Sequence, residues 1–137
     1  MKLLRPTLVV IGVVQIALGI VFLIPDLFAN VMGLEHPPGW VNWILAMLAA
    51  RALGFGYGML VAARDPRRHI TWIRAMIAVQ AIDWLGTLGY LAAGSVTLVN
   101  VTTAAFLPVV FVVILGRFAF GPESRAADAE RSVSAAL

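Results

Sequence analysis

The stretch WVNWILAMLAARALGFGYGMLVAA runs from Trp40 to Ala63, and its only strongly polar side chains are Asn42 and Arg51. A helix needs about 20 predominantly apolar residues to cross ~30 Å of hydrocarbon, so this stretch is long enough to span a bilayer. Backbone groups in lipid must be hydrogen-bonded within the segment, which favours a helix over a strand. The stretch therefore predicts a transmembrane helix with a permanent cation near its centre.

Three further stretches have a similar length and composition. The 137-residue chain is 61% hydrophobic and 12% charged, whereas soluble domains are about 45–50% apolar and about 25% charged. The sequence therefore predicts an all-α integral membrane protein with four transmembrane helices in an antiparallel bundle. We expect these helices at residues 7–24, 40–63, 66–93 and 96–118.

The connections between these stretches have their own signals. Residues 25–39 are too short to span and mix apolar with polar side chains, which predicts a short interfacial helix on the outer side, between the first two spans. Asp65 and Pro66 are typical of an N-cap and a first-turn proline, so the third helix is expected to begin there. We expect one transmembrane domain over residues 1–120 and a polar cytoplasmic tail over residues 121–137.

The basic residues predict the orientation, because Lys and Arg concentrate on the cytoplasmic side. They occur before the first span, around the connection between the second and third, and after the fourth. The other two connections contain none. Both termini are therefore expected in the cytoplasm of a bacterial cell, with the protein in its inner membrane. The net charge of +3 then indicates contact with anionic lipid rather than with nucleic acid. Apart from Arg51, the Lys and Arg residues are Lys2, Arg5, Arg64, Arg67, Arg68, Arg74, Arg117, Arg125 and Arg131.

Arg51 has a candidate partner on the next span. Helices two and three run in opposite directions, and both Arg51 and Asp83 lie roughly 15–16 Å below the outer face at ~1.5 Å per residue. Consecutive antiparallel helices usually pack as neighbours. The sequence therefore predicts an Arg51–Asp83 ion pair near the middle of the membrane.

Further polar and small side chains share faces with these two charges, which suggests a candidate pocket. Gln80, Thr87 and Tyr90 lie on the Asp83 face, and glycines permit close approach on the Arg51 face. Two interpretations stay open: a structural lock between helices, or a polar site that binds a ligand or relays protons. The candidate pocket residues are Gln15, Gly54, Gly58, Gln80, Thr87 and Tyr90.

The sequence carries no catalytic or metal-binding pattern. The absence of cysteine excludes thiol catalysis and thiolate metal sites. His36 and His69 are expected on opposite sides of the membrane, which argues against a shared metal or haem. We therefore predict no catalytic residues, no metal and no cofactor. An enzymatic activity is not favoured, although the sequence does not decide the point.

Several motifs are similar to those of one family. The chain has R-A-x-G-x-G-Y-G at residues 51–58, ARDP at 63–66 and QAIDW at 80–84. It thereby resembles the BphX-like proteins, part of the broader DoxX-like group of small bacterial membrane proteins, over residues 3–116. The resemblance implies a four-helix membrane protein associated with aromatic-degradation gene clusters. Some DoxX relatives are membrane partners of quinone-linked sulfur oxidation or of redox and thiol-stress complexes. The resemblance carries over no catalytic residues.

These observations favour a non-enzymatic accessory or scaffold protein that contains the Arg51–Asp83 pair. Its expected partners are the lipid bilayer and either another membrane protein or further copies of itself. The alternative is a binder or transporter of a small hydrophobic, anionic or quinone-like molecule, held in the candidate pocket.

Overall fold

A computed structural model describes residues 3–121, which form helices and no strands. Four of these helices are long and apolar enough to cross a membrane. The predicted class, an all-α membrane protein with four spanning helices, is confirmed, and so is a short helix between the first two spans. The helices are α1 (Leu4–Phe22), α2 (Pro25–Met32), α3 (Gly39–Arg64), α4 (Ile70–Ala92) and α5 (Leu98–Ala119).

The start of the third spanning helix differs from the prediction. It begins at Ile70 and not at residue 66. The Asp65 carboxylate accepts a hydrogen bond from the Arg68 backbone N–H at 3.2 Å, and the His69 Nδ1 lies 2.9 Å from the Asp65 carbonyl oxygen. Asp65 therefore closes a separate turn ahead of the helix. Most of the expected tail, residues 122–137, lies outside the described residues.

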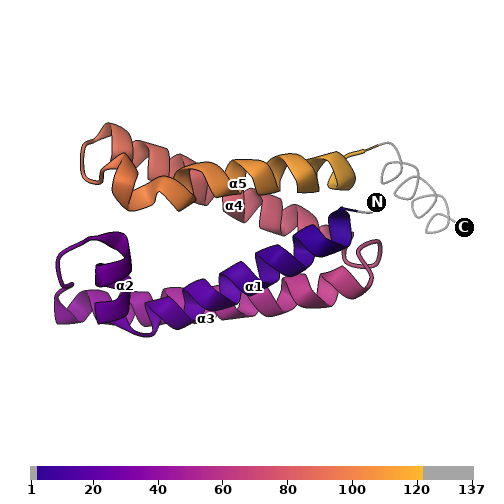
Figure 1. Cartoon of the computed structure of the whole chain (residues 1–137). Coiled ribbons are helices and arrows are strands. Elements are labelled where there is room, and N and C mark those ends of the chain that lie inside the picture. Colours follow the sequence, from indigo (N-terminus) through magenta and orange to yellow (C-terminus); the bar gives the residue numbers. More distant parts are fainter. Residues whose placement is uncertain (1–2, 122–137) are drawn as a thin grey trace, which may run out of the picture.

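The spanning helices form two antiparallel pairs, which we call the α1–α3 pair and the α4–α5 pair (Figure 1). In the α1–α3 pair, glycines allow the backbones to approach closely. A Cβ on Gly12 would lie 2.8 Å from the Leu60 side chain, and a Cβ on Gly56 would lie 2.7 Å from the Gly12 carbonyl oxygen. A side chain at Gly56 would push the two backbones apart, and one at Gly12 would displace the Leu60 side chain.

Side-chain hydrogen bonds to backbone carbonyls connect α4 with α5. The Trp84 Nε1 donates to the Ala105 carbonyl oxygen at 2.9 Å. The Arg74 guanidinium donates to the Ala119 carbonyl oxygen from Nε at 3.2 Å and from Nη2 at 3.0 Å, and it lies 5.5 Å from the centre of the Phe120 ring. Each of these bonds satisfies a backbone carbonyl as well as a side chain, so together they hold the α4–α5 pair.

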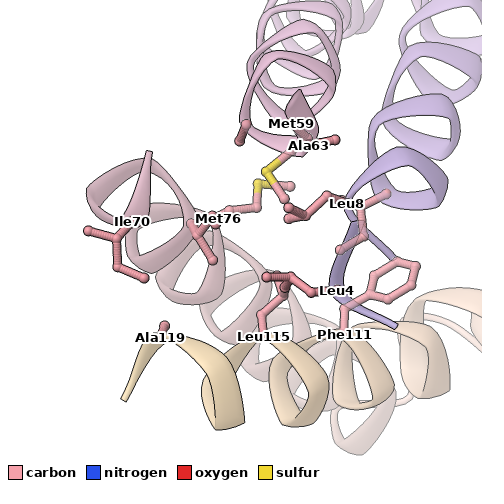
Figure 2. Packing of buried hydrophobic residues seen from close by; sticks show 12 residues of the cluster. Leu4, Leu8, Met59, Ala63, Ile70, Met76, Phe111, Leu115 and Ala119 are labelled. Atoms are coloured by element: carbon pink, nitrogen blue, oxygen red, sulfur yellow. The ribbon is translucent and has the colours of Figure 1, made fainter. Parts of the chain in front are cut away.

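The two pairs are joined through an apolar core at one end of the molecule. This end, which we call the arginine-rich end, holds the start of α1, the α3–α4 connection and the end of α5 (Figure 1). Figure 2 shows side chains from all four spanning helices meeting there. The fully buried members with the largest side chains are Leu8, Ile11, Met59, Ile73, Met76 and Leu115.

The pairs are joined a second time at the opposite end, which we call the α2 end. α2 ends at Gly33, whose φ of 63° is left-handed and suits glycine. The Asn100 side-chain amide, near the start of α5, donates to the Met32 carbonyl oxygen at 2.8 Å and is 3.4 Å from that of Gly33. α2 thus connects the α1–α3 pair to α5.

Candidate intramembrane binding site

Arg51 lies on the side of α3 that faces α4. Gly58 and Phe55 mark that side, because both contact Trp72 of α4. A Cβ on Gly58 would lie 2.4 Å from the Trp72 ring, and the Phe55 and Trp72 ring centres are 6.1 Å apart. Arg51 precedes Gly58 by seven residues, close to two full turns, so it shares this face. Its side chain is nevertheless exposed.

Asp83 occupies the corresponding side of α4. It follows Trp72 by eleven residues, close to three full turns, and therefore points toward α3 as Trp72 does. Asp83 is also exposed. The two opposite charges thus lie on facing sides of neighbouring helices, farther from the arginine-rich end than the contact of Gly58 with Trp72.

The predicted ion pair is absent from the single chain. Among residues 3–121, no ion pair joins Arg51 to Asp83, and both side chains stay exposed. One reason is that α3 and α4 approach each other closely only near the arginine-rich end. A second is register: counted from the Gly58–Trp72 contact, Arg51 lies ~10 Å along α3 and Asp83 ~16 Å along α4, about one turn apart.

The two glutamines lie at the edge of the apolar core. Gln15 follows Ile11, and Gln80 follows Met76, by one turn each, and both preceding residues belong to that core. Gln80 is buried and Gln15 is half-buried. Both amides therefore lie along the helices between the apolar core and the depth of Arg51 and Asp83.

The other predicted pocket residues differ in their contacts and in their exposure. The Thr87 hydroxyl donates to the Asp83 carbonyl oxygen at 2.8 Å, within its own helix. Tyr90 is 65% exposed. A Cβ added at Gly54 would have no atom within 4 Å, whereas Gly58 is closed off by Trp72. Open space therefore lies beside Arg51, but the structure does not gather all six predicted residues around one point.

Sequence reasoning missed two residues that position this region. It assigned no partner to Asn100, which holds α2 against α5. It gave no role to the Trp84 indole, which bonds to Ala105. Gly33, as a helix-ending glycine, signals where α2 stops. No local signal identifies a partner 68 residues away in the chain.

The facing sides of α3 and α4 present hydrogen-bonding and charged groups but, within residues 3–121, no catalytic arrangement. Arg51 offers several N–H donors and a permanent positive charge, and Asp83 offers carboxylate oxygens. Within residues 3–121, no three His, Asp or Glu side chains gather as a metal site. The His36 Nδ1 and the Asp26 Oδ1, 3.1 Å apart, form an exposed pair at the α2 end, away from both charges.

Comparison of the chain with protein-family models, with curated proteins and with solved structures finds no match.

Proposed function

We propose that this protein is a non-enzymatic membrane protein that binds a small lipophilic molecule between its two helix pairs. The single observation that supports this proposal is that the pairs are joined at both ends and left uncovered between them. Arg51 and Asp83 are exposed there, and added Cβ atoms at Gly54 and Gly86 would meet nothing within 4 Å. Such a region is reached sideways, from the lipid.

The two other roles considered for the charges fit this geometry less well. A structural lock requires contact between Arg51 and Asp83, and the described residues do not form it. An accessory role requires a helix of another protein to cover both charges. A full spanning helix is ~10 Å wide and cannot lie between two pairs that are joined by the core at one end and by Asn100 at the other.

The proposal includes the location of the protein. We place it in a bacterial inner membrane, with the arginine-rich end in the cytoplasm, because the basic residues of the described chain concentrate there. We also keep the BphX-like assignment as a hypothesis, on the motifs at residues 51–58, 63–66 and 80–84.

Binding can be tested in phosphatidylcholine nanodiscs with 9,10-dibromostearic acid and its methyl ester, since bromine quenches nearby tryptophans such as Trp72 and Trp84. We expect saturable quenching, reversed by the unbrominated compound. Gly54→Leu should fill the open space and reduce the apparent affinity about tenfold or more. Gly116→Leu is the matched control, because a Cβ there also meets nothing within 4 Å. Quenching by both probes that never saturates, or that Gly54→Leu leaves unchanged, would refute the proposal.

A further inference from the structure

Arg51 is the one charge of the candidate site that cannot be neutralised in place. A carboxyl group such as that of Asp83 can lose its charge by binding a proton, whereas a guanidinium remains protonated in proteins. An uncompensated cation in hydrocarbon is energetically unfavourable. Arg51 is exposed and has no ion pair within residues 3–121. Residues 3–121 thus leave this charge uncompensated.

The surroundings of Arg51 leave room for a negatively charged group beside it. Gly54 lies one turn away on the same face, and a Cβ there would meet nothing within 4 Å. Asp83 is about one turn out of register across the gap, so it does not occupy that place. Met47, one turn on the other side, is an exposed apolar residue. A charged head next to Gly54 and an apolar tail toward Met47 would match these neighbours.

We infer that the ligand is a single-chain lipophilic acid, whose carboxylate pairs with Arg51 and whose tail lies along the uncovered side of α3. This inference rests on the proposed function and names its ligand class. Charge complementarity selects an anion over a neutral or cationic amphiphile. Depth excludes the phosphodiester of a phospholipid, because Arg51 is twelve residues from Gly39 and thirteen from Arg64, about 18–20 Å from either end of α3.

The two brominated probes separate this inference from the proposed function. They have the same tail and differ only in the charge of the head, so their comparison needs no variant. At a pH where the acid is ionised, we expect the wild-type protein to bind it about tenfold or more tightly than the methyl ester. If neither probe saturates, the proposed function fails. If both saturate with equal affinity, the function stands and the assignment of an anionic ligand is refuted.

Variants locate the charge that binds the acid. Arg51→Met should weaken binding of the acid about tenfold or more and leave binding of the ester within about twofold, since truncating one member of a buried charge pair has a large cost. Arg51→Lys keeps the cation and should retain most of the affinity. Arg68→Met is the matched control, because Arg68 is an exposed arginine at the arginine-rich end. Equal losses in Arg51→Met and Arg68→Met would refute the assignment.

Two further binding measurements test the role of Asp83 and of phospholipid headgroups. Asp83→Asn removes a negative charge that faces the same region, so the acid should bind at least as tightly as to the wild type. A tenfold loss in this variant would make Asp83 the ligand partner and overturn the inference. Adding phosphatidylglycerol to the nanodiscs should change the apparent affinity by less than about twofold. A larger loss would show that phospholipid headgroups occupy the Arg51 site, which also refutes a single-chain acid.

Discussion

α3 packs against α1 and α4 in opposite ways. Against α1 it presents small residues that bring the backbones together, from Ala49 near the α2 end to Gly56 beyond the middle. Against α4 it packs only near the arginine-rich end, where the large Trp72 ring of α4 meets Phe55 and Gly58. The difference indicates that α1 and α3 form one continuous unit, whereas the α3–α4 face is fixed at one end and uncovered along the rest.

The largest expected effect comes from breaking the α1–α3 contact. Gly56→Leu would place a Cβ 2.6 Å from Ile16 and 2.7 Å from the Gly12 carbonyl oxygen, and such overpacking costs about 3 kcal/mol or more. We expect a large loss of folded protein in thermal unfolding in detergent. Gly54→Leu, two residues away in open space, is the control and should not lose stability. Similar unfolding of both variants would contradict the close α1–α3 contact.

An intermediate effect is expected from the connection at the α2 end. Asn100→Asp keeps an oxygen for the capping box with Thr97 but removes the donor to Met32. A lost hydrogen bond of this kind costs about 1–2 kcal/mol, so the backbone amides of α2 should exchange with deuterium about tenfold faster. Asn30→Asp makes the same change on an exposed position of α2 and should leave this exchange unchanged. Unaltered exchange in Asn100→Asp would mean that α2 is held by other contacts.

A smaller effect is expected for the two membrane-embedded charges. In a double-mutant cycle with Arg51→Leu and Asp83→Leu, the effects on the free energy of unfolding should add within about 0.5 kcal/mol, because residues that are not in contact rarely couple. The cycle is measured by denaturation in detergent. A coupling energy well above 1 kcal/mol would show that the ion pair forms and that α3 and α4 close along their length.

The smallest effect is expected at the exposed pair of His36 and Asp26. Their side chains are 69% and 81% exposed, and exposed pairs contribute about 0–1 kcal/mol. His36→Gln should therefore change the free energy of unfolding by less than about 0.5 kcal/mol. A loss as large as that of Asn100→Asp would show that this pair, rather than Asn100, fixes the α2 end.

The sequence was sufficient for the elements and insufficient for their pairing. Hydropathy located four spans, because a bilayer requires a length and composition that few soluble helices have. The mixed composition of residues 25–39 indicated a short helix, which the structure places at Pro25–Met32. Hydropathy did not show that α3 packs on α1 more closely than on α4. Chain order favours α4 as the neighbour, whereas the glycines at 12, 19 and 56 favour α1, and only the folded structure decides between these signals.

The depth of the two charges could be predicted from the sequence, but whether they are in contact could not. Matching depths brought Arg51 and Asp83 to within about one turn of each other, since rise per residue is constant along a helix. Depth says nothing about the lateral distance between two helices, and that distance keeps the charges apart. The role of Asn100 depends on a backbone carbonyl of a distant segment, which no spacing along the chain reveals.

Because the two helix pairs are joined at both ends, the joined ends also determine which ligand concentration governs binding, that in the lipid or that in water. A compound that reaches the uncovered side of α3 does so by diffusing in the plane of the bilayer. Its occupancy then follows its mole fraction in the lipid rather than its molarity in water. A compound that partitions strongly into lipid would fill even a weak site at a low aqueous dose, and a water-soluble analogue with the same head would not.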